Sequence, residues 1–186
     1  MGKESQCYDD SELLPKDQEG NPQYAQIYLH RDGFRLPTEA EWEVICRSGT
    51  TSAYSFGNDL QLLGQYGWYQ ETSNQWSHSV GLLRPGLRGL FDIHGNLFEW
   101  CHDWFAEYAD SASVGNPIGP AKGSRRVFRG GSWDYPARYC RAAYRSRSGP
   151  SQRGYDMGFR LARVPVSQAG AEQPVRGANG AGSVGP

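Results

Sequence analysis

The sequence lacks three features that would each mark a class of protein. It has no excess of one charge, because 19 Lys and Arg residues balance 20 Asp and Glu residues to a net charge of −1. It has no run of about eighteen apolar residues that could cross a bilayer, and its first residues contain no apolar core of a secretory signal. We therefore expect no nucleic-acid partner, no membrane span and a cytoplasmic location.

The motifs of several common active sites are also missing. No CxxC or HxxxH pair supports a zinc centre, and no nucleophile elbow or glycine-rich phosphate loop is present. The chain has four cysteines, and sequence alone does not choose among their disulfide pairings. In a cytoplasmic protein we expect reduced thiols at Cys7, Cys46, Cys101 and Cys140.

Glycine, proline and aromatic residues are abundant, with 24 Gly, 11 Pro, 11 Tyr and 6 Trp. This composition favours a loop-rich fold held together by aromatic and arginine packing. Residues 1–23 are polar with several breakers and indicate an extended entry segment. Residues 24–165 form the expected folded domain, and residues 166–186 are a Gly/Ala-rich stretch that predicts a disordered tail or linker.

One helix is clearly indicated after Pro37. Thr38 followed by Glu41 forms a capping box, Arg47 lies in the expected last turn, and Gly49 is expected to end the helix. Its apolar stripe consists of Trp42, Ile45 and Cys46. Beyond it we expect an ordered aromatic loop at Thr50–Trp76, and strands at Ser79–Leu83, Arg126–Trp133, Tyr139–Arg147 and Met157–Val164.

The stretch Gly89–Trp104, GLFDIHGNLFEWCHDW, combines a turn with a strand. Gly95-Asn96 predicts the tight turn, because both residues tolerate positive φ. The alternation that follows predicts a strand with two unlike faces. The aromatic face carries Phe98, Trp100, His102 and Trp104, and the acidic face carries Glu99, Cys101 and Asp103.

Two carboxylates flank this turn, Asp92 before it and Glu99 after it. Calcium takes six to eight oxygen ligands from carboxylates and main-chain carbonyls, so a structural calcium site fits this loop. The alternative is that Asp92 caps the turn and Glu99 pairs with an arginine.

Four blocks in this order resemble the formylglycine-generating-enzyme (sulfatase-modifying-factor) superfamily. They are RLPTEAEWEVICRSG (Arg35–Gly49), GLFDIHGNLFEWCHDW, RVFRGGSW (Arg126–Trp133) and MGFRLAR (Met157–Arg163). The resemblance implies an α+β, C-type-lectin-like fold over roughly Tyr28–Val164. Roughly the N-terminal third of that family's domain has no counterpart here, which would leave a strand edge open to an oligomeric or fusion partner.

The resemblance also implies a set of calcium ligands and a copper site. The calcium would be bound by the side chains of Asp92 and Glu99 and by the carbonyls of Gly95 and Leu97. A second calcium site of the family is not supported, because Gly67 and Trp68 stand where its asparagine is expected.

The family's oxidase chemistry, which converts a sulfatase cysteine to formylglycine, uses a cuprous ion on two cysteines just after the GGS motif. The matching positions here are Tyr135 and Cys140. A phenol is a poor ligand for a soft ion, so we expect no copper and no oxidase activity. Cys140 is the residual position of the copper dyad, and a working oxidase remains the alternative function.

The segment Trp133–Tyr155 is rich in Tyr, Arg, Ser and Gly, the residues of adaptable binding surfaces. It is similar to the variable region of lectin-fold proteins diversified by retroelements. We therefore predict a non-catalytic module that binds a protein or small molecule, or a structural adaptor. The predicted ligand-binding residues are Trp133, Asp134, Tyr135, Arg138, Tyr139, Arg141, Tyr144, Arg145, Arg147, Ser148, Ser151, Arg153 and Tyr155. The alternative is that the arginines stack on aromatics inside the domain and the tyrosines fill its core.

Overall fold

The computed structural model describes residues 33–108 and 117–164, and residues 34–163 form one compact unit. The expectations for residues 1–23, for Cys7 and for the tail at 166–186 lie outside the described residues. No helix within the described part of the chain is long and apolar enough to cross a membrane.

Helix α1 (Glu39–Arg47) forms as its capping signals predict. The Thr38 side chain accepts a hydrogen bond from the Glu41 backbone N–H, and the Glu41 carboxylate accepts one from the Thr38 N–H, which completes the capping box. The helix ends as predicted: Arg47 is its last residue, Ser48 is the C-cap with φ 52°, and Gly49 follows with φ 90°. Trp42 and Cys46 are buried, so the predicted apolar stripe does face the core.

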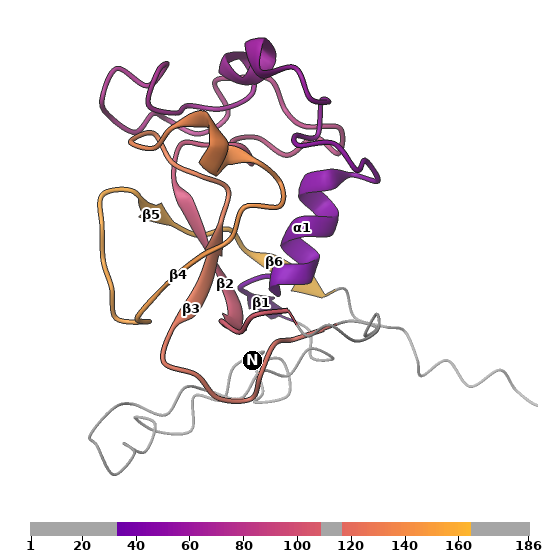
Figure 1. Ribbon diagram of the computed structural model, residues 1–186, viewed down its shortest axis with the longest axis vertical. Helices are drawn as coiled ribbons and strands as arrows, with labels where there is room; N and C mark the ends of the chain where they lie inside the picture. The colour runs from indigo at the N-terminus through magenta and orange to yellow at the C-terminus, as the bar shows by residue number, and fades with distance from the viewer. Residues whose placement is uncertain (1–32, 109–116, 165–186) are drawn as a thin grey trace, which may run out of the picture. The chain divides into compact units, whose positions relative to one another are not determined.

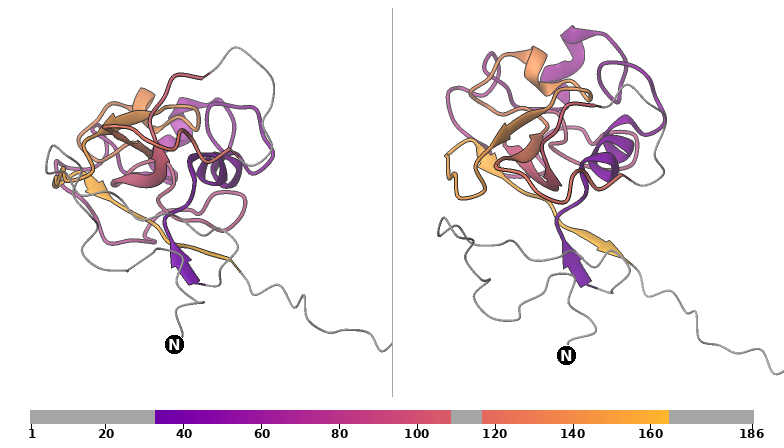
Figure 2. Two further views of the ribbon diagram at one scale, coloured as in Figure 1. Left: turned by 90° about the horizontal axis from the view of Figure 1, so that it is seen from below. Right: turned by 60° about the horizontal axis from the view of Figure 1, so that its bottom comes forward.

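A four-stranded sheet carries the rest of the core. Its order is β4 (Ser146–Ser148), β3 (Arg126–Arg129), β2 (Phe98–Trp104) and β5 (Met157–Gly158) (Figure 1). β3 pairs antiparallel with both β2 and β4, and β5 pairs parallel with β2. β1 (Gly33–Arg35) and β6 (Ala162–Val164) form a separate two-stranded sheet, and Figure 2 shows them side by side.

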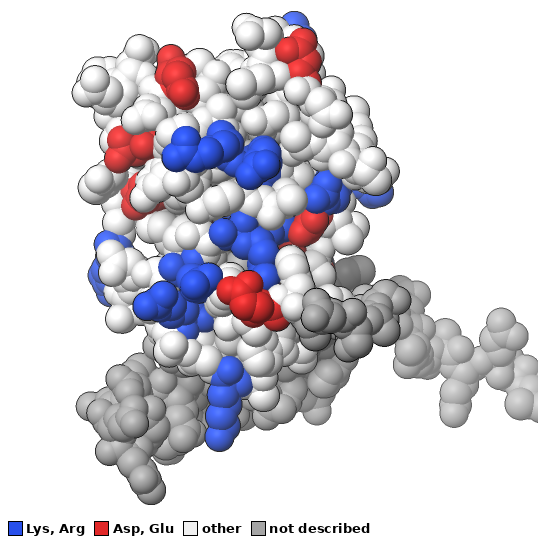
Figure 3. Space-filling view, in the orientation of Figure 1, with Lys and Arg blue, Asp and Glu red and all other residues white. Residues whose placement is uncertain are grey.

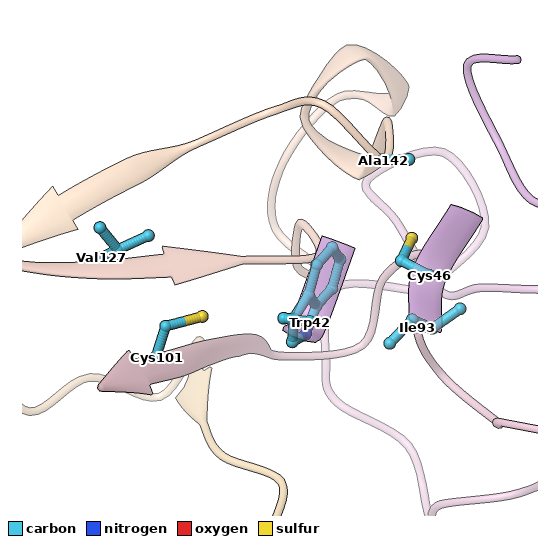
Figure 4. Close-up of a cluster of buried hydrophobic side chains, with 6 residues drawn as sticks. All are labelled: Trp42, Cys46, Ile93, Cys101, Val127 and Ala142. Atoms are coloured by element: carbon cyan, nitrogen blue, oxygen red, sulfur yellow. The ribbon is translucent and has the colours of Figure 1, made fainter. Parts of the chain in front are cut away.

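The two faces of β2 are the predicted ones, and the acidic face is the more deeply buried. Glu99, Cys101 and Asp103 are buried on that face, which packs against α1. The Trp42 Nε1–H donates to Glu99 at 2.7 Å, and the Glu39 backbone N–H donates to Asp103 at 2.7 Å. Figure 4 shows the apolar cluster at this junction, which consists of Trp42, Cys46, Ile93, Cys101, Val127 and Ala142.

All four strands predicted outside the Gly89–Trp104 stretch are wrong in part or entirely. The range 126–133 is a strand only as far as Arg129, where β3 ends before Gly130 and Gly131, whose φ values are positive. Residues 79–83 form no strand, because Gly81 has φ 79° and its N–H donates to the Asp92 carboxylate and not to a neighbouring strand. The range 139–147 contains the end of the 3₁₀ helix η3 (Ala137–Cys140) and only the start of β4. The range 157–164 is interrupted between β5 and β6, and Arg160 in the gap turns to Glu99.

The aromatic loop at Thr50–Trp76 is ordered, as expected. It contains the 3₁₀ helix η2 (Leu60–Gln65), and its Tyr54 and Leu63 pack with Ala137 and Cys140 in a second buried cluster. Ring stacking of Phe56 with Tyr54 and with Tyr66 rigidifies it further, with centroid separations of 5.1 and 4.3 Å. The loop therefore supports the chain that follows β3.

Candidate ligand-binding surface and cation site

A double-glycine turn sets the path of the chain that leaves β3. Gly130 and Gly131 have φ of 99° and 78°. A Cβ at Gly131 would lie 2.6 Å from the Cys140 Sγ, so the backbone passes directly over that thiol. The absence of a side chain at Gly131 therefore permits this close approach of two segments.

The segment that follows alternates between anchored and exposed residues. Ser132, Ala137, Cys140 and Ala142 are buried. The aromatic loop holds the backbone from the other side, because the Gln70 N–H donates to the Tyr135 carbonyl at 3.0 Å and the Ser73 hydroxyl donates to the Trp133 carbonyl at 2.8 Å. The side chains between the anchors are accordingly presented outward from a fixed backbone.

Three predicted residues form a continuous tyrosine row, defined here as Tyr135, Tyr139 and Tyr144. Phe98 of β2 supports one end of the row, with its ring centroid 5.0 Å from that of Tyr135. The next separations along the row are 5.1 Å to Tyr139 and 4.7 Å from there to Tyr144, both edge-to-face. All three tyrosines are half-buried, so the row is both packed and accessible.

A second aromatic pair lies at the end of the segment. Trp133 and Tyr155 have centroids 5.6 Å apart, and the Trp133 Nε1–H donates to the Tyr155 carbonyl at 3.3 Å. Tyr155 is 73% exposed, and its hydroxyl lies 3.5 Å from a carboxylate oxygen of Asp134. These three predicted residues are thus neighbours at the surface.

The predicted arginines divide into one internal and several external residues. Arg145 donates through Nε and Nη2 to both carboxylate oxygens of Glu39 at 2.6 Å and lies over the ring of Tyr108. Arg138 is exposed over the ring of Tyr139, and Arg141 donates through Nε to the Arg138 carbonyl. The remaining predicted residues are Ser148, half-buried on β4, and the exposed Arg147, Ser151 and Arg153.

Acidic and basic side chains lie at different parts of this surface. Burial raises the pKa of Tyr135, and the nearby carboxylates of Asp156 and Asp134 raise it further. Figure 3 shows Lys and Arg side chains gathered over η3 and β4, with Asp and Glu side chains at the edge beside β5. The tyrosine row therefore begins beside acidic groups and continues under a basic one.

The copper-dyad position Cys140 is fully buried beneath this surface. Burial raises the pKa of its thiol well above the usual range. The free thiols of Cys46 and Cys101 are buried as well, in the other core cluster, and burial raises the pKa of Cys46 to about 12. At neutral pH these thiols stay protonated.

The predicted cation ligands lie together in a cavity of about 350 Å³ that is also lined by the Gly95-Asn96 turn. Asp92, Gly95, Leu97 and Glu99 all line it. Asp92 has φ 58°, and its Oδ2 accepts a hydrogen bond from the Gly81 N–H at 2.8 Å. Its Oδ1 is buried and has no hydrogen-bond partner among residues 33–108 and 117–164. An unpartnered carboxylate oxygen at a cavity fits an oxygen-ligated cation.

Glu99 has protein partners of its own. It accepts hydrogen bonds from Arg160 at both carboxylate oxygens, at 2.6 and 2.7 Å, and one from Trp42. Pairing of Glu99 with an arginine, one of the two alternatives drawn from the sequence, is therefore present. Within the described residues no group of three or more His, Cys, Asp or Glu side chains could hold a metal ion, so any site here depends on backbone carbonyls.

The sequence analysis did not identify two residues that lie next to the predicted binding residues. Phe98 was assigned to the aromatic face of its strand, but its contact with Tyr135 spans 37 positions and no local pattern shows it. Asp156 lies one residue beyond the predicted segment. Its carboxylate raises the pKa of Tyr135, because the chain folds back before β5 and brings the two residues close together.

Comparison with known proteins places the chain. Residues 12–165 match the sulfatase-modifying factor enzyme 1-like domain. Formylglycine-generating enzyme from Streptomyces coelicolor is 37% identical over 155 residues, covering 74% of this chain and 49% of that enzyme. Serine/threonine-protein kinase pkn1 from Chlamydia pneumoniae is 36% identical over 143 residues, covering 75% of this chain and 22% of the kinase.

A solved structure, Treponema denticola variable protein 1, matches with a TM-score of 0.73 at 44% identity, covering 76% of this chain and 51% of that one. The chain thus spans about half the length of the Streptomyces enzyme and of the Treponema protein. The expected α+β fold, loop-rich with little regular secondary structure, is confirmed. The chain belongs to the formylglycine-generating-enzyme, or sulfatase-modifying-factor, family.

Proposed function

We propose that this domain is a non-catalytic binding module whose ligand contacts the Trp133–Tyr155 segment. The observation that carries the proposal is the tyrosine row, because it is held rigidly from behind and accessible from the front. Tyrosine offers a large contact area at a small cost in conformational entropy, and a fixed backbone lowers that cost further.

The copper positions support the same proposal. The second thiol of the dyad is replaced by Tyr135, whose ring is part of the row. The remaining thiol, Cys140, is buried and protonated at neutral pH, whereas cuprous copper binds thiolates. The replaced ligand position has thus become part of the surface.

Diversification of this segment is the finer form of the proposal. Buried anchors alternate with outward-facing Tyr, Arg, Ser and Asp residues, so the outward positions tolerate exchange without loss of the fold. The likeness to a protein named a variable protein supports this form. Copies of the reading frame that differ at Asp134, Tyr135 and Tyr139 but not at Ala137 or Cys140 are the expected genomic pattern.

Arg145 is the one predicted contact that we reassign. Its guanidinium is bound to both oxygens of the buried Glu39, which leaves little of it for a ligand. We therefore propose a structural role for Arg145 and retain the other predicted residues as the binding set.

We also propose that one calcium ion binds in the cavity near the Gly95-Asn96 turn. Asp92 would contribute side-chain oxygens, and Gly95 and Leu97 would contribute carbonyls. Glu99 would join them only on release of Arg160, which now binds both of its carboxylate oxygens. The unpartnered Asp92 Oδ1 supports this proposal. The ion would stabilise the turn that leads into β2, and through it the Phe98 support of the tyrosine row.

Two measurements test the binding proposal against an oxidase. A cysteine peptide incubated with the protein, cuprous copper and oxygen should keep its thiol; thiol loss that Cys140→Ala abolishes would support the oxidase instead. Selection of a displayed random dodecapeptide library on the immobilised protein should yield binders that Tyr139→Ala weakens. A melting temperature unchanged by Tyr139→Ala controls for folding.

A further inference from the structure

We propose that the partner is a peptide segment of mixed charge that places carboxylates against Arg138 and Arg141 and a basic side chain against Asp134 and Asp156. This inference rests on the proposed binding function and specifies the chemistry of its ligand. It follows from the polarity of the surface along the tyrosine row.

The basic end of the surface consists of Arg138 and Arg141. Both are exposed, and neither forms an ion pair within the described residues. The Arg138 guanidinium lies 4.7 Å from the Tyr139 ring centroid, and its Nη2 donates to the Tyr139 hydroxyl at 3.3 Å. Arg141 donates through its Nε–H to the Arg138 carbonyl. Each retains free N–H groups in the forked geometry that matches a carboxylate.

The acidic groups lie beside Tyr135, at one end of the row, whereas Arg138 lies over Tyr139, its middle ring. Asp134 is exposed and Asp156 is half-buried, and both carboxylates raise the pKa of the intervening Tyr135 hydroxyl. Neither aspartate forms an ion pair with the described basic residues. The half-buried Trp133 and the exposed Tyr155 lie beside them, so a cation bound here would also contact aromatic rings.

The arrangement of basic and acidic groups along the surface distinguishes between classes of partner. A nucleic acid or an anionic bilayer presents one sign of charge throughout, and its phosphates would meet Asp134 and Asp156. A folded or extended polypeptide carries both signs at chosen positions and supplies apolar side chains for the tyrosines between them. Charge complementarity thus favours a protein segment, acidic at the arginine end and basic at the aspartate end.

Charge reversal tests this assignment. Random dodecapeptides displayed on phage are selected on the wild-type protein and on the double variant Arg138→Glu/Arg141→Glu. Wild-type selection should enrich Asp and Glu toward one end of the peptides and Lys or Arg toward the other. The double variant should bind wild-type-selected peptides about tenfold or more weakly and should instead enrich basic residues.

The control is Arg84→Glu/Arg88→Glu, which makes the same change in net charge at two exposed arginines outside the segment. It should leave affinity and selected sequences unchanged. Asp134→Lys gives the reciprocal arm and should remove the preference for a basic residue.

The outcomes separate this inference from the function on which it rests. Peptides without charge preference that still lose affinity in Tyr139→Ala would keep the binding function and overturn the inference. Selected peptides insensitive to every substitution in the segment would overturn both. Tighter binding of a single-stranded oligonucleotide or of phosphatidylserine vesicles than of any selected peptide would also contradict the mixed-charge assignment.

Discussion

At the scale of single residues, burial separates the side chains that hold the fold from those free to recognise a partner. Glu39 is buried, and its carboxylate lies between the fully buried Arg129 at 3.2 Å and Arg145 at 2.6 Å. Arg138, by contrast, forms no ion pair with a carboxylate within the described part of the chain. Two arginines of the same segment therefore differ in role: Arg145 stabilises the fold, and Arg138 is available to a partner.

Removing the charge of Glu39 should destabilise the protein strongly. Glu39→Gln leaves two guanidinium groups without their shared carboxylate, and breaking a buried ion pair costs about 3 kcal/mol. For a domain of this size we expect the melting temperature to fall by about 6–12 °C. Thermal unfolding measures the effect, and Glu71→Gln at an exposed position is the control. Equal melting temperatures for the two variants would contradict the buried network.

Acid should destabilise the fold through His94. Burial lowers the pKa of His94 from 6.5 to about 4, and the ring is held by the Ser55 N–H and the Cys140 carbonyl. Between those two values the unfolded chain binds a proton that the folded protein does not, so stability falls as the pH drops from about 6.5 to 4. The contribution is roughly 3 kcal/mol at its limit. His102, whose pKa burial also lowers to about 4, acts in the same direction.

Asp103 opposes this trend, because burial raises its pKa to about 6 and its protonation favours the folded state. Denaturant unfolding at several pH values measures the sum. His94→Gln should flatten the acid limb of the curve even though it lowers stability at neutral pH. An unchanged slope in that variant would exclude His94 as a source of the pH dependence.

At the scale of elements, the double-glycine turn after β3 determines where the proposed binding segment begins. The residue that Gly131 approaches is Cys140, nine residues later in the chain and the last residue of η3.

Replacement of Gly131 by alanine should unfold or strongly destabilise the domain. The new Cβ would meet the Cys140 backbone and Sγ at 2.6–3.0 Å, and φ of 78° is strained for any L side chain. Overpacking and left-handed strain together cost about 2–5 kcal/mol. Gly149→Ala is the matched control, because its added Cβ meets nothing within 4 Å. Comparable urea midpoints for the two variants would contradict the close approach.

Several elements could be predicted because their signals are local. Thr38 and Glu41 lie within one helical turn, and the period-2 alternation of β2 is complete in seven residues. The strand expected at 79–83 failed because a distant carboxylate, that of Asp92, captures the Gly81 N–H. The strand expected at 139–147 failed because Ala142 donates to the Ala53 carbonyl of the aromatic loop.

At the scale of the whole molecule, calcium should raise stability if the cavity by Asp92 is its site. At a free concentration ten times the dissociation constant, mass action contributes about 1.4 kcal/mol, or about 3–6 °C in melting temperature. Asp92→Ala should abolish the shift, whereas Asp134→Asn should retain it. Identical melting curves with chelator and with millimolar calcium would contradict calcium binding in this cavity.

The sequence by itself determined the family, the capped helix and the Gly95-Asn96 turn, because each depends on residue identity or on neighbours within a few positions. Tertiary structure alone decided which arginines are internal, that Phe98 supports Tyr135, and that the tyrosine row runs from carboxylates to guanidinium groups. Those features depend on contacts between residues tens to a hundred positions apart, and chain folding, which no local pattern encodes, brings them together.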